Sequence, residues 1–203
     1  TGSFSNSAFG LIKFRPMKKF YFALAFFHIV FFSFAQYQSA FWGMTYAGGN
    51  GGGVVFKTNG YGDSLEIAHD FINLPGRNPL YSQLCAVPGG KLFGLTFGGG
   101  PYDGGGLYEF DVNTGIYTPK VIFNGTTDGK NPYGSLTLAS NGKLYGMTQS
   151  GGAYNLGVLF EYDPATDVFT KKIDFVSAST GRNPYGSLLA ASNGLLYCLT
   201  SGG

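Results

Sequence analysis

Charged and metal-binding side chains are scarce in this sequence of 203 residues. Asp, Glu, Lys and Arg together make up 12% of it, and there are two cysteines and two histidines. So few charges argue against a disordered chain, which would be charge-rich and poor in aromatic residues. Cys85, Cys198 and His69 do not have the spacing of a zinc site. We therefore expect no metal site, and no motif indicates a bound cofactor.

The few basic residues are distributed unevenly. The first 35 residues hold four of them and no acid, whereas the chain from Gln36 onward holds nine basic and eleven acidic residues. No stripe of Lys and Arg is present in this second part, and such a stripe is what a nucleic-acid-binding surface needs. A nucleic-acid partner is therefore not expected.

Glycine and aromatic residues are abundant instead. There are 34 glycines, and Phe, Trp and Tyr reach 17%. Glycine weakens helices, whereas Tyr, Phe and Thr favour strands. The composition predicts an all-β fold with many tight turns.

A leader precedes the folded part. Met17-Lys18-Lys19 is followed by a nearly continuous apolar stretch over 20–34 and then by Ala35-Gln36. A basic start, an apolar stretch and small residues before a cleavage point are typical of a secretory signal peptide, here 17–35. The alternative is a membrane anchor, but the stretch is shorter than the roughly 20 residues that a spanning helix needs.

This assignment divides the chain into three parts. Residues 1–16 precede the natural start and are interpreted as an upstream segment outside the fold, and 36–203 is a repeat region. After cleavage no membrane span is expected, and the location is secreted or cell-surface.

The repeat region has a period near 52 residues. A short strand-like motif ends at Thr45, Thr96, Thr148 and Thr200, in steps of 51, 52 and 52 residues. Such a period, with strand-like content, is the signature of an array of repeated β units.

Each repeat is expected to hold four short strands, which in the third repeat cover residues 133–139, 143–148, 158–162 and 169–175. Asn141-Gly142 lies between two apolar runs and predicts a hairpin. Four strands in about 50 residues are typical of a β-propeller blade, with a parallel solenoid as the alternative. The expected core between blades is Leu144, Tyr145, Phe160 and Phe175.

The region contains about three and a quarter such repeats. Closed propellers have at least four blades, and a third strand is expected after Gly202-Gly203. We therefore interpret the sequence as a fragment of a larger propeller.

The repeated motif resembles a known family. Asn141–Gly152, followed by Gly157–Asp163, is similar to the GloVer tandem repeat of secreted bacterial proteins, and the similarity covers nearly all of 41–203. The resemblance implies an extracellular, propeller-like array without established catalytic residues. Cys198 departs from the pattern, which has Gly there. More distantly, Gly151-Gly152 and the run from Tyr162 to Thr166 resemble a kelch repeat.

No catalytic site is expected from the residues themselves. His69 is interpreted as a surface histidine, because no Gly-x-Ser-x-Gly motif supplies a nucleophile. Cys85 and Cys198 lie on different strands two repeats apart and are expected to be free and buried. The glycine run 48–53 leads into a strand, so it is no phosphate-binding loop, which would need a helix after it.

One repeated polar motif is a candidate ligand site, formed by Asn131, Tyr133, Asn183 and Tyr185 in two Asn-Pro-Tyr copies. The structural interpretation is that Asn before Pro is extended and starts a strand. The functional interpretation is a ring of Asn and Tyr that binds sugars.

Three functions remain open at this stage. They are a non-enzymatic scaffold or interaction module that binds an extracellular glycan or protein, a carbohydrate-binding propeller, and a glycan-acting enzyme whose site lies in further repeats. The first of these, a protein without enzymatic activity, is the one expected.

Secretion predicts cleavage between Ala35 and Gln36. N-terminal sequencing of the protein from the culture medium should begin at Gln36, because small residues precede that bond. A mature chain that begins at Thr1 would contradict the assignment of the signal peptide.

Overall fold

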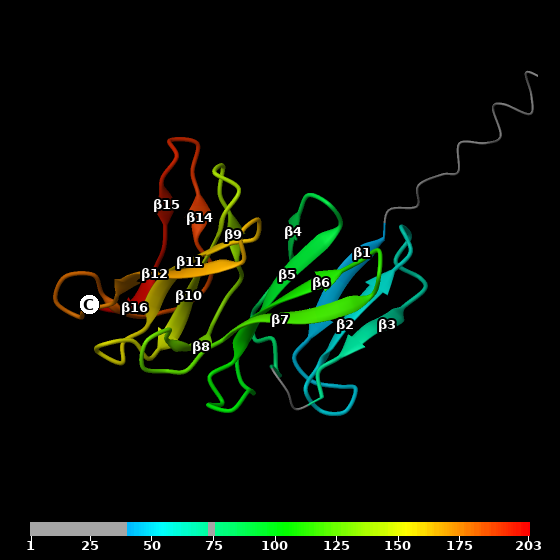
Figure 1. The fold of residues 1–203 in the computed structure, drawn as a ribbon, viewed down its shortest axis with the longest axis horizontal. Helices are drawn as coiled ribbons and strands as arrows, with labels where there is room; N and C mark the ends of the chain where they lie inside the picture. Colours follow the sequence, from blue (N-terminus) through cyan, green and yellow to red (C-terminus); the bar gives the residue numbers. More distant parts are fainter. Residues whose placement is uncertain (1–39, 73–75) are drawn as a thin grey trace, which may run out of the picture. The chain divides into compact units, whose positions relative to one another are not determined.

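The computed structural model describes residues 40–72 and 76–203, which belong to one structural body spanning 39–203. The predicted signal peptide and its cleavage site lie outside the described residues. The described chain contains strands and turns but no helix, so it has no apolar helix of the length needed to span a membrane. The prediction of an all-β fold is confirmed (Figure 1).

Successive repeats form successive antiparallel sheets, none of them closed on itself. Unit 1 (40–72), unit 2 (76–123), unit 3 (124–175) and unit 4 (176–203) are the names used below. Unit 1 contains β1 (Phe41–Thr45), β2 (Val54–Thr58) and β3 (Glu66–Asp70). Unit 2 contains β4 (Cys85–Val87), β5 (Lys91–Thr96), β6 (Gly106–Asp111) and β7 (Ile116–Ile122), paired in that order.

Unit 3 follows the same order with a divided first strand, and in unit 4 both the first and the second strand are divided. Unit 3 contains β8 (Lys130–Pro132), β9 (Thr137–Leu138), β10 (Leu144–Ser150), β11 (Val158–Asp163) and β12 (Val168–Asp174). Unit 4 contains β13 (Arg182–Pro184), β14 (Leu189–Ala190), β15 (Leu196–Tyr197) and β16 (Thr200–Gly202). All strand pairs are antiparallel, which excludes a parallel solenoid.

The expected continuous strand over 133–139 is wrong. β8 and β9 both pair with β10, but the residues between them turn toward unit 4. Gly186 N donates to Tyr133 O at 2.8 Å, and a Cβ on Gly134 would lie 2.2 Å from Gly186 O. Contact with the next unit therefore replaces pairing within the sheet, and it requires glycine.

The core lies between successive units, as predicted. One cluster joins Phe93 and Leu95 of unit 2 to Leu144 and Phe160 of unit 3, all of them buried. Phe175 is also buried, and Tyr145 packs beside it with its ring half-buried. Each sheet thus buries its apolar face against a neighbour and not within itself.

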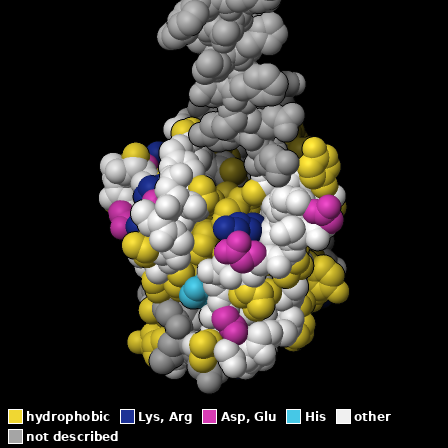
Figure 2. Space-filling view, turned by 90° about the vertical axis from the view of Figure 1, so that its right-hand side faces the viewer, with side chains coloured by type: hydrophobic (Ala, Val, Ile, Leu, Met, Phe, Trp, Pro, Cys, Tyr) yellow, Lys and Arg dark blue, Asp and Glu magenta, His cyan; other side chains and the backbone are white. Residues whose placement is uncertain are grey.

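Unit 1 has an apolar face that no other described unit covers. Phe41 is 59% exposed, whereas Leu92, its counterpart in unit 2, is 8% exposed. Figure 2 shows hydrophobic side chains interspersed with charged ones on the side of the molecule that carries the first sheet.

The repeated threonine of units 1 to 3 accepts a backbone hydrogen bond, and in units 2 and 3 it is buried. Thr148 is fully buried; its Oγ1 accepts from Val158 N at 3.1 Å and donates to Ser150 O at 3.0 Å. Thr96 is bonded to Gly106 N in the same way, at 3.1 Å. The hydroxyl satisfies a backbone group at the point where the glycine-rich loop leaves the sheet.

Replacing Thr148 with Val should lower the free energy of unfolding by about 1–3 kcal/mol, because the buried Val158 N–H would lose its acceptor. Urea unfolding followed by tyrosine fluorescence measures this. The control is Thr170→Val on the exposed side of β12, which should change stability by less than about 0.5 kcal/mol. Equal effects of the two substitutions would contradict the assigned role.

Candidate ligand-binding face

The candidate asparagines join successive units. The Nδ2 of Asn131 donates to Phe97 O of unit 2 at 3.0 Å, and its backbone N donates to Gly104 O at 2.7 Å. Asn183 repeats the pattern one unit later, with its Nδ2 3.0 Å from Gln149 O. Each asparagine therefore closes the two ends of the preceding glycine-rich loop, and its amide donor is already used.

The expectation that Asn before Pro is extended is wrong. Asn131 and Asn183 have φ of 54° and 48°, in the left-handed region. Asn tolerates that region better than most residues because its short polar side chain bonds locally. The turn is what directs the amide back to the preceding unit.

The candidate tyrosines, Tyr133 and Tyr185, lie against one another, and Tyr81 of unit 2, which the sequence analysis did not select, extends the row. The ring centroids of Tyr81 and Tyr133 are 4.9 Å apart, and those of Tyr133 and Tyr185 are 4.5 Å apart. Tyr81 is 71% and Tyr185 42% exposed. We call Tyr81, Tyr133 and Tyr185 the tyrosine ladder.

Three further observations concern the tyrosine ladder. Tyr81 has a φ of 50°, a costly conformation for a bulky residue, although most of its side chain faces solvent. Gln149 Nε2 donates to the hydroxyl of Tyr185. Tyr185 also lines a groove of roughly 400 Å³ together with Leu189, Tyr197 and Leu199.

A second pair of exposed tyrosines was missed from the sequence. Tyr102 and Tyr154 are 64% and 60% exposed in the glycine-rich loops of units 2 and 3. The residue after each one braces its loop: Asp103 Oδ1 accepts from Gly99 N at 2.7 Å, and Asn155 Oδ1 from Gly151 N at 3.1 Å. Their recurrence 52 residues apart was the available signal.

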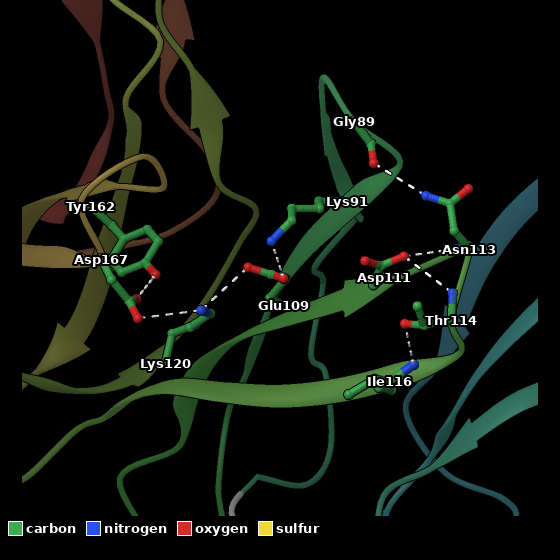
Figure 3. Close-up of polar contacts among 10 residues, drawn as sticks. All are labelled: Gly89, Lys91, Glu109, Asp111, Asn113, Thr114, Ile116, Lys120, Tyr162 and Asp167. Carbon is green, nitrogen blue, oxygen red and sulfur yellow. Dashed lines mark hydrogen bonds and ion pairs between the residues drawn. The ribbon is translucent and has the colours of Figure 1, made fainter.

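Charged residues also join units 2 and 3. Lys91 Nζ lies 2.6 Å from Oε1 of the buried Glu109, and Lys120 Nζ lies 3.3 Å from its Oε2. Lys120 also reaches Asp167 of unit 3 at 3.3 Å, and the Tyr162 hydroxyl donates to Asp167 (Figure 3). These charges compensate one another, so the network is structural.

Glu161 takes the place of Glu109 in unit 3. Lys143 Nζ and the Tyr145 hydroxyl each lie 2.7 Å from its carboxylate oxygens, and Lys172 Nζ lies 3.5 Å away. The hydrogen bond from Lys143, then that from Tyr145, lowers the pKa of Glu161 to about 2. The carboxylate is held ionised as an acceptor and is not poised to transfer a proton.

His69 is partly exposed, in keeping with the sequence-based interpretation, but part of its ring is covered. Its ring stacks on Tyr117 of unit 2 with centroids 4.1 Å apart. Burial lowers the pKa of His69, although neighbouring Asp70 acts in the opposite direction. The histidine therefore belongs to the contact between units 1 and 2.

The cysteines are free, as expected, but only Cys85 is partly buried; Cys198 is exposed. The predicted burial of Cys198 is therefore wrong. Within the residues that the structure describes, no three His, Cys, Asp or Glu side chains gather in a way that could hold a metal ion.

Comparison with known proteins identifies the repeat. The model of the Gloeobacter/Verrucomicrobia repeat matches residues 31–203. No protein with a curated description matches the sequence.

A similar solved structure is the extracellular domain of a protein described as a one component system from B. thetaiotaomicron. The TM-score is 0.56 and the identity 18%, over 81% of this chain and 19% of that one. This chain thus spans about a fifth of that structure, and the likeness concerns the fold alone.

The pKa of Glu161 predicts a pH dependence. The folded-state pKa lies below the ordinary 4.5, so the stabilisation is present above pH 4.5 and is lost as pH falls from about 4.5 toward 2. Glu161→Gln should cost about 1–3 kcal/mol at pH 6 and less at pH 3, as measured by urea unfolding. Glu66→Gln, at a 66% exposed side chain, is the control. A cost for Glu161→Gln that is the same at both pH values would contradict this account.

Proposed function

The chain belongs to the Gloeobacter/Verrucomicrobia repeat family, and we propose that it is a stretch of β-propeller-like blades that acts outside the cell as a non-enzymatic interaction module. Each repeat of about 52 residues supplies one blade. Its partner is an extracellular glycan or protein.

The packing of the units supports the propeller arrangement. β4, β9 and β14, which occupy the same position in successive units, lie side by side, with β9 in contact with both of the others. The sheets follow one another in chain order (Figure 1), and unit 2 is a four-stranded antiparallel sheet. A kelch-like blade has this strand order, with its first strand nearest the axis.

The extracellular location rests on the predicted signal peptide. The structural likeness to an extracellular domain agrees with it. The scarcity of charges and the free, partly exposed thiols neither require nor oppose it.

The observation that carries the interaction role is the tyrosine ladder. Three aromatic side chains from three units contact one another in a row, with Tyr81 and Tyr185 exposed and Tyr133 between them partly buried. The Asn and Thr side chains around them are hydrogen-bonded within the scaffold. The array therefore holds a rigid aromatic row on a framework whose own polar groups are satisfied.

Carbohydrate binding is the form of this role that the ladder favours. A tyrosine ring offers a flat apolar face and a hydroxyl, which suit the C–H face and the hydroxyl groups of a sugar. Gln149, bonded to Tyr185, adds a polar side chain at the edge of the row. Asn131 and Asn183 act here by positioning Tyr133 and Tyr185, not by touching the sugar.

Alanine at both Tyr133 and Tyr185 should weaken the binding of polysaccharides about tenfold or more, because each lost aromatic contact costs about 0.5–1.5 kcal/mol. Affinity electrophoresis of the secreted protein in gels that contain plant and bacterial polysaccharides measures this. Tyr61→Ala is the matched control: Tyr61 is 78% exposed in the turn between β2 and β3, away from the ladder.

Each result bears on the proposal. Unchanged affinity after loss of both ladder tyrosines would overturn the assigned carbohydrate site. Release of new reducing ends from any polysaccharide by the secreted protein would overturn the non-enzymatic role.

A further inference from the structure

Tyr81 of unit 2 and Tyr133 of unit 3 place two phenol rings in contact across the junction between these units. Their ring centroids are 4.9 Å apart, and their ring planes are inclined by 32°. Their hydroxyl groups are hydrogen-bonded to each other; partial desolvation, followed by this bond, raises the pKa of Tyr133. Two hydrogen-bonded oxygens lie about 3 Å apart, so a small rotation of either ring brings an ortho carbon of one against an ortho carbon of the other.

The fold holds this pair of tyrosines where solvent reaches it. Tyr81 is 71% exposed and keeps a φ of 50°, a costly conformation for a bulky residue. The backbone of Tyr133 is fixed by the hydrogen bond from Gly186 N to its carbonyl oxygen, at 2.8 Å. Tyr133 has a ladder tyrosine on each side and is still only partly buried, so the row is open to solvent along its length.

The other contact within the ladder has a different geometry. The rings of Tyr133 and Tyr185 are 4.5 Å apart, but their planes are inclined by 74°. In such a contact the edge of one ring meets the face of the other. The hydroxyl of Tyr185 is bonded to Gln149 Nε2 and not to a neighbouring tyrosine. A bond between two ortho carbons needs two ring edges to meet, and this contact does not offer that arrangement.

Unit 2 contains a second tyrosine pair of nearly the same geometry, but without access to solvent. The rings of Tyr108 and Tyr117 are 5.0 Å apart, and their planes are inclined by 32°. Tyr108 is 1% exposed, and its hydroxyl donates to Met44 Sδ at 2.6 Å. A reagent dissolved in water does not reach Tyr108. This pair is therefore an internal reference that has the ring geometry of Tyr81 and Tyr133 but not their accessibility.

We propose that Tyr81 and Tyr133 are a site of oxidative modification, at which hydrogen peroxide and an extracellular haem peroxidase join the two rings into dityrosine and so fasten unit 2 to unit 3. Each phenol loses one electron and one proton and becomes a tyrosyl radical. The two radicals form a carbon–carbon bond between ortho carbons, and the hydrogen on each coupled carbon then moves to its ring oxygen as a proton. Hydrogen peroxide accepts the two electrons and two protons and is reduced to two molecules of water.

The test treats the secreted protein, at a low concentration that disfavours contacts between molecules, with hydrogen peroxide and a plant haem peroxidase. Mass spectrometry of the digested monomer should find the peptides of Tyr81 and Tyr133 joined, with a mass that is lower than their sum by two hydrogen atoms. The bond links residues 52 positions apart and restricts the unfolded chain. The midpoint of thermal unfolding should therefore rise by about 5 °C or more.

Tyr133→Phe keeps the ring but lacks the phenolic oxygen, so it should abolish both the joined peptides and the rise in the unfolding midpoint. The matched control is Tyr102→Phe, because Tyr102 is 64% exposed in the glycine-rich loop of unit 2. The control should form the bond between Tyr81 and Tyr133 in full yield. Thermal unfolding of each variant before treatment establishes that it is folded, since neither substitution removes a ring.

Several results would overturn the proposal. Dityrosine that forms only between molecules, or in equal yield in Tyr133→Phe, would do so, as would a bond between Tyr108 and Tyr117 in place of the expected one. The absence of dityrosine under conditions that couple free tyrosine would also overturn it. A bond between Tyr81 and Tyr133 that leaves the unfolding midpoint unchanged would support the modification site and overturn its role in fastening the two units.

Discussion

Close backbone contact between successive units holds this array together, and the rest of the structure depends on it. A Cβ on Gly134 of unit 3 would lie 2.2 Å from Gly186 O of unit 4, and one on Gly157 of unit 3 would lie 2.9 Å from Pro184 Cδ of unit 4. Side chains larger than hydrogen do not fit at these points. The abundance of glycine is therefore a packing requirement of the array and not only a source of turns.

Contact this close brings backbone amides and carbonyls together in a region with little water, where each needs a partner. Thr148 and Asn131 supply those partners, the first within a unit and the second between units. These residues recur with the period because the same backbone groups need hydrogen-bond partners at each junction. Their side-chain hydrogen bonds are consequently made within the protein.

The buried charged side chains also have partners within the protein. Glu109 and Glu161 are buried but surrounded by lysines, and burying a carboxylate without such partners would be costly. Among the outward-facing residues are the tyrosines of the ladder and of the glycine-rich loops. The candidate function follows from these residues, which the packing of the units leaves accessible.

The sequence by itself determined the period, the all-β class, the hairpin turns and the apolar positions of the core, because these follow from local turn chemistry and from residues that recur at one spacing. It also identified Asn131, Tyr133, Asn183 and Tyr185 as candidates, but it did not distinguish a structural role from a ligand-binding one. Only the tertiary structure decided that the asparagines are bonded to the preceding loop while the tyrosines contact one another. It also decided that His69 is stacked on Tyr117 and that Arg77 is paired with Asp103. Each of these features depends on contacts between residues 26 or more positions apart in the chain. A local sequence pattern does not show which distant loops and units come into contact.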